Sequence, residues 1–170
     1  IALARNSKPA NYRPDTPSSA RTRSINCGEA AKMAVSSDSI SAPVVDDTAL
    51  TDADIASKNL ILWGDPGSNA VLRRILAKLP LSWTDKTLTF RGQSYAADHH
   101  APILIFPNPL NPEHYVVLNS GIDFRDHAYG TNALQIPKLP DYAIVDLHEA
   151  PGPRWPGKIV TAGFFDEQWK

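Results

Sequence analysis

Cysteine is almost absent from this sequence, since Cys27 is the only one among 170 residues. A single thiol excludes an intramolecular disulfide bond, and it makes a zinc site built on several thiolates unexpected. Cysteine poverty fits a cytoplasmic protein, and it fits equally a secreted bacterial domain that does not rely on disulfides. Because the first residue is Ile1 and not Met, we expect a mature or excised piece of a longer chain.

An excess of charge of either sign is also missing. The sequence contains 17 Lys and Arg residues and 18 Asp and Glu residues, which gives a formal net charge of -1. Such a balance argues against binding to a nucleic-acid backbone or to an anionic membrane surface. No apolar run approaches the ~20 residues that a membrane-spanning helix requires. We therefore expect a soluble protein without a nucleic-acid partner or membrane span, secreted or periplasmic, with the cytoplasm left open.

Complete catalytic motifs are missing too. The nucleophile turn G-x-S-x-G does not occur, because Gly64-Asp-Pro-Gly-Ser68 has the wrong spacing and Ser120 has no glycine two residues before it. The zinc motif H-E-x-x-H is absent, and the neighbours His99 and His100 point to opposite sides of an extended chain. We expect no metal, no other cofactor and no catalysis by the chain alone. A catalytic triad assembled in space stays an alternative. Its candidate residues are Ser120, His100, His127 and Asp126.

Residues 1–44 differ in composition from the rest of the chain. They are rich in Ser, Ala, Pro, Asn and Arg and show no sustained apolar period. Such a stretch buries too little apolar surface to offset its ordering entropy. We predict an irregular, largely extended arm over residues 1–44 and a single domain over residues 45–170.

Short apolar runs in residues 45–170 predict an α/β fold. A run at Leu60–Trp63 ends at small polar residues, and an amphipathic helix is expected next, because its apolar residues at Val71 to Leu79 fall on one stripe. Residues 87–96 alternate like an edge β-hairpin. Further strands are expected at 103–106, 115–118, 142–146 and 158–162, the first two of these pairing antiparallel. The predicted fold is a layered, Rossmann- or flavodoxin-like domain of four to six strands with a mixed, mostly parallel sheet.

Loops at the ends of the predicted strands supply the candidates for ligand binding. Backbone N–H groups at the start of the helix after Asp65-Pro-Gly67 would attract a phosphate or a carboxylate. Asp65, Ser68 and Asn69 can instead hold this turn through hydrogen bonds to the backbone. Asn119 follows another strand, and Trp155 could stack on a carbohydrate. An anion- or carbohydrate-binding module is therefore a second alternative.

Five segments together resemble a known kind of domain. They are residues 60–69 (LILWGDPGSN), 106–112 (FPNPLNP), 115–121 (YVVLNSG), 137–142 (PKLPDY) and 163–169 (GFFDEQW). As a set they are similar to the C-terminal accessory domain of large bacterial, planctomycete-type α/β-hydrolase or prolyl-oligopeptidase-like proteins. The resemblance covers residues 45–170 and implies a noncatalytic domain whose partner, a serine hydrolase or peptidase domain, holds the nucleophile.

Overall fold

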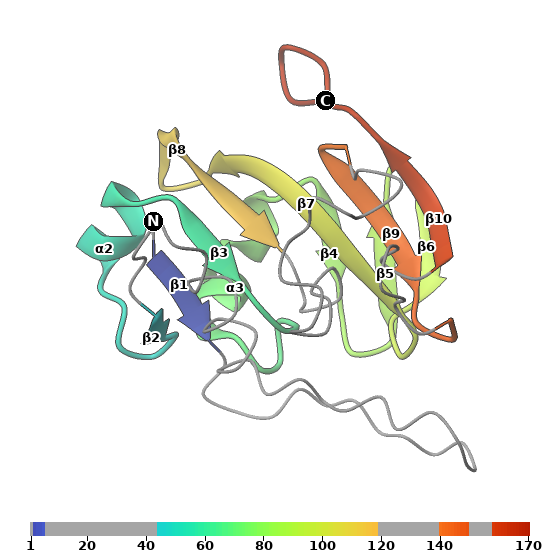
Figure 1. Ribbon diagram of the computed structural model, residues 1–170, viewed down its shortest axis with the longest axis horizontal. Coiled ribbons are helices and arrows are strands. Elements are labelled where there is room, and N and C mark those ends of the chain that lie inside the picture. The colour runs from blue at the N-terminus through green and yellow to red at the C-terminus, as the bar shows by residue number, and fades with distance from the viewer. Residues whose placement is uncertain (1, 6–43, 119–139, 150–157) are drawn as a thin grey trace, which may run out of the picture.

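The computed structural model describes residues 2–5, 44–118, 140–149 and 158–170. Seven strands form the main sheet, in the order β10-β9-β7-β8-β3-β1-β2 (Figure 1). Their bounds are β1 Ala2–Arg5, β2 Val44–Asp46, β3 Leu60–Leu62, β7 His100–Asn108, β8 Asn111–Leu118, β9 Tyr142–Asp146 and β10 Lys158–Gly163.

The main sheet is mixed, as the sequence predicts. The pairs β1–β2, β1–β3 and β3–β8 are parallel, whereas β7–β8, β7–β9 and β9–β10 are antiparallel. Antiparallel pairing of the strands at 103–106 and 115–118 is confirmed, with Leu104 opposite Leu118. Parallel pairs do not predominate, however. With the second sheet described below, the described residues hold ten strands, which is more than the four to six predicted.

A second, three-stranded sheet lies behind the main sheet in Figure 1, in the order β4-β5-β6. Its antiparallel strands are β4 Leu81–Trp83, β5 Thr87–Phe90 and β6 Gln93–Ala96. The predicted β5–β6 hairpin is present, but it belongs to this separate sheet and not to the edge of the main one. Arg91 and Gly92 form its two-residue turn with positive φ angles of 48° and 79°, as a type I′ turn requires.

The hairpin turn is anchored to the main sheet by Arg91. Its guanidinium donates a hydrogen bond to the hydroxyl of Tyr142 on β9 and lies 5.0 Å from the centre of that ring. Phe90 packs on the same ring, with 4.8 Å between the ring centres. Packing against the main sheet therefore decides where the hairpin lies, which is why its alternating pattern alone suggests the wrong neighbour.

Two short helices begin at side-chain caps. Helix α2 (Asp52–Ser57) has Thr51 as its N-cap, in a capping box with Asp54. Helix α3 (Ala70–Ile75) has Asn69 as its N-cap and continues into the 3-10 helix η1 (Leu76–Lys78). The apolar stripe is confirmed, because Val71, Leu72 and Ile75 are all buried.

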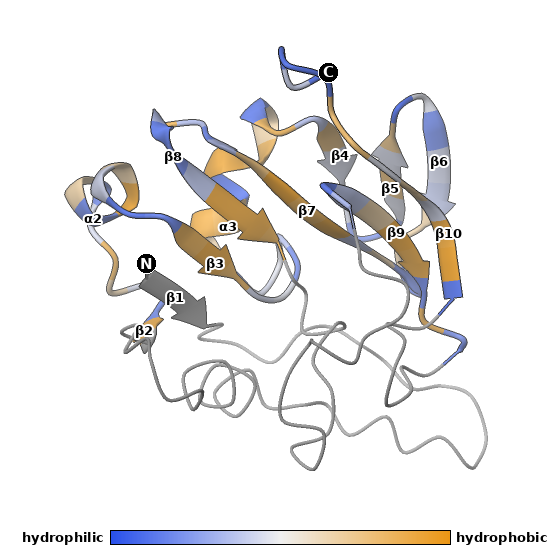
Figure 2. Ribbon diagram, turned by 45° about the horizontal axis from the view of Figure 1, so that its top comes forward, coloured by the Kyte–Doolittle hydropathy of each residue, from blue (hydrophilic) through white to orange (hydrophobic). Residues whose placement is uncertain are grey.

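Most of the core lies on one face of the main sheet. Figure 2 shows α3 and the three-stranded sheet behind the apolar strands of that sheet. One cluster of buried residues joins them, including Leu62 of β3, Leu72 of α3, Leu88 of β5 and Ile144 of β9. A smaller cluster holds the alternate residues of β7 and β9, such as Ile103 and Val145. Successive side chains of a strand point to opposite faces, so both faces of these strands are buried.

Two asparagines join the β7–β8 hairpin to the end of α2. Asn108 is completely buried, and its Nδ2 donates to the carbonyl oxygen of Ile55 at 2.6 Å. Asn111 Nδ2 donates to the carbonyl of Ala56 at 2.9 Å. The last carbonyls of a helix have no partner within it, and these side chains supply one from another element.

The start of the chain differs in part from expectation. Residues 2–5, in the predicted arm, form β1, with neighbours on both sides in the sheet; residues 6–43 lie outside the described residues. At the other end, residues 166–169 form a turn held by Asp166, whose Oδ1 accepts from the N–H groups of Gln168 and Lys170. Trp169 packs on Phe106 and Tyr115, with ring centres 5.9 and 5.7 Å apart.

Candidate functional site

The loop after β3 is closed by its own side chains. Asp65 Oδ1 accepts hydrogen bonds from the N–H groups of Gly67 and Ser68, at 2.7 and 2.8 Å. Ser68 Oγ in turn lies 3.1 Å from the N–H of Asp65 and is buried. Asp65 and Ser68 therefore hold the turn, which is the structural interpretation that the sequence offers for them.

Asn69 and a second aspartate, Asp47, accept hydrogen bonds from backbone N–H groups at the start of α3. Asn69 is completely buried; its Oδ1 accepts from the N–H of Leu72 at 2.9 Å, and its Nδ2 donates to the carbonyl of Trp63 at 2.9 Å. Asp47, which follows β2 and is buried, accepts from the N–H of Ala70 at 2.5 Å through Oδ2. One N–H group at this helix N-terminus is thus bonded to a carboxylate of the chain itself.

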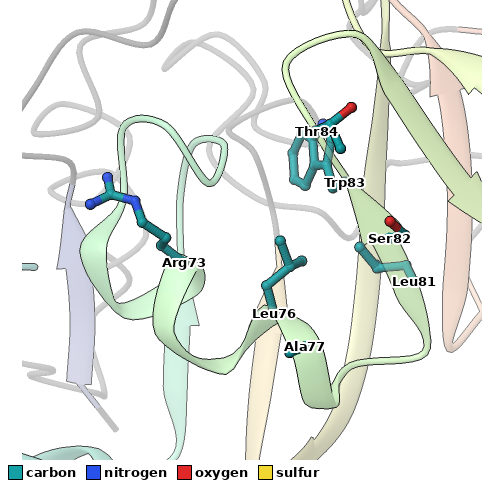
Figure 3. A pocket seen from close by; sticks show the side chains of 7 residues that line it. All are labelled: Arg73, Leu76, Ala77, Leu81, Ser82, Trp83 and Thr84. Carbon is teal, nitrogen blue, oxygen red and sulfur yellow. The ribbon is translucent and has the colours of Figure 1, made fainter.

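A shallow pocket of about 500 Å³ lies between α3, η1 and β4 (Figure 3). Its wall carries one charged side chain, Arg73, which turns away from β4. Arg73 donates to the carbonyls of Pro66 and Gly67, at 2.8 and 2.9 Å. The other wall residues are Leu76, Ala77, Leu81, Ser82, Trp83 and Thr84. This pocket has neither a general base nor a carboxylate in its wall, and its cation is bonded to the loop.

Five of the candidate residues lie outside the described residues: Asn119, Ser120, Asp126, His127 and Trp155. The remaining catalytic candidate, His100, begins β7. Its Nδ1 lies 3.0 Å from the carbonyl oxygen of Ala96, and its ring packs on Tyr95 with 5.4 Å between the ring centres. These contacts give His100 a structural role at the start of the strand.

A group of metal-ligating side chains forms where β7 begins and β9 ends. It consists of His99, Asp146 and His148, each of which offers one ligand atom, and these atoms all lie within 4.8 Å of one another. The backbone fixes their approach, because His100 pairs with Asp146 and the N–H of Leu147 donates to the carbonyl of His99 at 2.7 Å.

The side chains of this group already contact one another. His148 Nδ1 lies 2.9 Å from Asp146 Oδ1, and the rings of His99 and His148 have their centres 4.2 Å apart. A further carboxylate, that of Asp98, lies 2.5 Å from His99 Nδ1. Asp146 is the most enclosed of the three, with 14% of its side chain exposed.

Asp146 is held in its charged form. The backbone N–H of His148 donates to its carboxylate at 3.0 Å, and this bond lowers the pKa of Asp146 below its usual range. Desolvation by burial opposes the shift, while the His148 side chain and the charge of His100 add to it. An ionised carboxylate beside two imidazoles is a set of metal-binding donors.

Sequence reasoning missed this group because its members are far apart in the chain. His99 stands 47 residues before Asp146 and is joined to it only by the β7–β9 pairing. The one local signal is Asp146-Leu-His148 at the end of a predicted strand, since residues i and i+2 of an extended chain point the same way. The expectation that His99 and His100 point to opposite sides is wrong: His99 lies in the turn before β7, and the two ring centres are 4.4 Å apart.

Comparison with known proteins gives no match to a family model, to a curated protein or to a solved structure. The resemblance to hydrolase-associated accessory domains therefore stays a prediction. Within the described part of the chain, no helix has the length and apolar character needed to cross a membrane.

Proposed function

We propose that this chain is a noncatalytic accessory or interaction domain associated with a bacterial serine hydrolase or peptidase of esterase or prolyl-oligopeptidase-like type. The proposal joins the resemblance over residues 45–170 to the character of strand β10. We also propose that the domain has a layered, Rossmann- or flavodoxin-like fold. The parallel half of the main sheet, β2-β1-β3-β8, supports this. The proposal also includes a secreted or periplasmic location.

The observation that carries the proposal is an exposed apolar edge. Strand β10 is the outer strand of the main sheet, so one row of its backbone N–H and C=O groups faces away from β9. Val160 within β10 is 41% exposed, and Phe164, directly after it, is 72% exposed. An open strand edge beside an exposed aromatic side chain is suited to contact with another protein domain.

The described loops support a noncatalytic role. In the loop after β3 the Asp65, Ser68 and Asn69 side chains are engaged in hydrogen bonds that hold the backbone. A serine nucleophile requires a nearby base and an oxyanion hole to react. In the loop after β3, Ser68 Oγ is instead hydrogen-bonded to the backbone of Asp65.

Three experiments test the proposal. The chain is assayed against chromogenic acyl esters and aminoacyl amides beside Ser120→Ala; we expect no turnover above that variant, and serine-dependent turnover would establish the independent hydrolase instead. The full open reading frame is then sequenced, and we expect a G-x-S-x-G hydrolase domain upstream or in the adjacent gene.

Binding to that hydrolase domain is measured by titration calorimetry with the wild type and Phe164→Ser. Exposed residues can be replaced with little loss of stability, so both proteins should be equally folded. We expect Phe164→Ser to weaken binding about tenfold or more, as a central aromatic contact does. Equal affinities would refute the role of the β10 edge.

A further inference from the structure

We propose that His99, Asp146 and His148 form a site for one Zn²⁺-like divalent transition-metal ion. The donor set carries this inference. Two imidazoles and one carboxylate are the protein ligands of open zinc sites, in which a water molecule completes the tetrahedron. An all-oxygen group would favour Mg²⁺ or Ca²⁺, whereas imidazole favours zinc and its neighbours in the periodic table.

The separations fit a metal after a small adjustment. Zinc lies about 2.0–2.2 Å from nitrogen and oxygen ligands, so two ligands of a tetrahedral site are about 3.3 Å apart. The pair Asp146 Oδ1 and His148 Nδ1, at 2.9 Å, is already near that value. The widest separation in the group is within 4.8 Å, and side-chain rotation on the order of 1 Å closes it.

The side chain with most freedom to make this adjustment is His148. It is 66% exposed, whereas the side chains of His99 and Asp146 are 28% and 14% exposed. The backbone of His99 and Asp146 is held by the hydrogen bonds between β7 and β9, whereas the exposed imidazole of His148 can rotate to bind the ion. Metal binding would use the β7–β9 pairing as its rigid support.

Asp98 and Lys158 form the surroundings of the site. Asp98 Oδ1 lies 2.5 Å from His99 Nδ1, so His99 would bind the ion through Nε2. A carboxylate on the far nitrogen of a metal-bound imidazole fixes the ring and makes it a stronger ligand. Lys158 Nζ lies 3.9 Å from Asp146 Oδ2, the oxygen that the pairing with His148 does not use.

The test uses the untagged full chain, stripped with EDTA and titrated with ZnCl₂ in competition with a chromogenic zinc chelator. We expect one Zn²⁺ per chain. His148→Ala, which removes an exposed side chain, should weaken binding about tenfold or more without loss of fold, and Asp98→Asn should weaken it by a smaller factor.

His114→Ala is the matched control. His114 lies on β8 near Pro107, at the far end of β7 from His99, so its replacement should leave Zn²⁺ affinity unchanged. Cys27→Ser should also bind as the wild type does. The proposal is overturned if the wild type takes up no Zn²⁺, or if His148→Ala binds it as tightly. Loss of affinity in Cys27→Ser or His114→Ala would assign the ion to other ligands. None of these results depends on hydrolase association.

Discussion

Replacing Asn108 by alanine should destabilise the protein strongly, although the residue is polar and lies at the end of strand β7. The side chain is completely buried and makes two hydrogen bonds: Nδ2 donates to the carbonyl of Ile55, and Oδ1 accepts from the N–H of Leu110 at 3.0 Å. In Asn108→Ala both backbone groups lose their partner. A buried polar group left unsatisfied costs about 1–3 kcal/mol, so we expect a loss of about 2–4 kcal/mol.

Urea unfolding followed by circular dichroism measures this loss. With a slope of about 2 kcal/mol per molar urea, the midpoint of Asn108→Ala should fall by about 1–2 M. Asn111→Ala is the matched control, because Asn111 also donates to a carbonyl at the end of α2 but is partly exposed. Water can replace its hydrogen bonds, and we expect a loss of about 1 kcal/mol or less.

A third variant separates the two hydrogen bonds. Asn108→Asp keeps the acceptor for Leu110 but turns an oxygen toward the carbonyl of Ile55, so it should also be strongly destabilised. The reasoning would be refuted if Asn108→Ala stayed within about 0.5 kcal/mol of the wild type, the range of ordinary surface substitutions.

Two further predictions concern a sheet contact and a surface carboxylate. In Gly163→Ala the new Cβ would lie 2.8 Å from Cζ of Tyr142, so the ring must shift. Thermal unfolding should show a loss of about 1–3 kcal/mol in the free energy of unfolding. The same substitution in a Tyr142→Leu background should cost less, and an equal loss there would contradict this cause. Hydrogen bonds from Lys58 and Thr51 lower the pKa of Asp54 from 3.8 to about 2. A carboxyl group whose pKa is lower in the folded than in the unfolded protein stabilises the fold at pH values above its unfolded pKa. This contribution is lost as the pH falls from about 4 to 2. Unfolding midpoints of Asp54→Asn should therefore fall less steeply over that range, and an unchanged slope would count against the pairing.

Much of the local structure follows from the sequence. The strands at Leu60, Ile103 and Tyr142 are short apolar runs, and burial on both faces is what such runs predict. Thr51 and Asn69 cap the helices because their side-chain oxygens reach backbone N–H groups only three residues away. These features depend on neighbours in the chain.

The pairing of distant segments could not be predicted in the same way. The four residues of β1 stand in a stretch without a sustained apolar period, yet they pair on both sides within the sheet. The hairpin at 87–96 was recognisable, but its place behind the main sheet depends on Arg91 meeting Tyr142, 51 residues later. Asp47 at the start of α3 likewise comes from another element.

The candidate site likewise depends in part on the local sequence and in part on the pairing of distant segments. The sequence by itself determined that few thiols, little net charge and no complete catalytic motif were present, and that Asp65, Ser68 and Asn69 suit a turn. Only the tertiary structure brought His99 to Asp146 and His148. The physical reason is that antiparallel pairing of β7 with β9 sets which residues stand opposite one another, and that register is fixed by packing on both faces of the sheet.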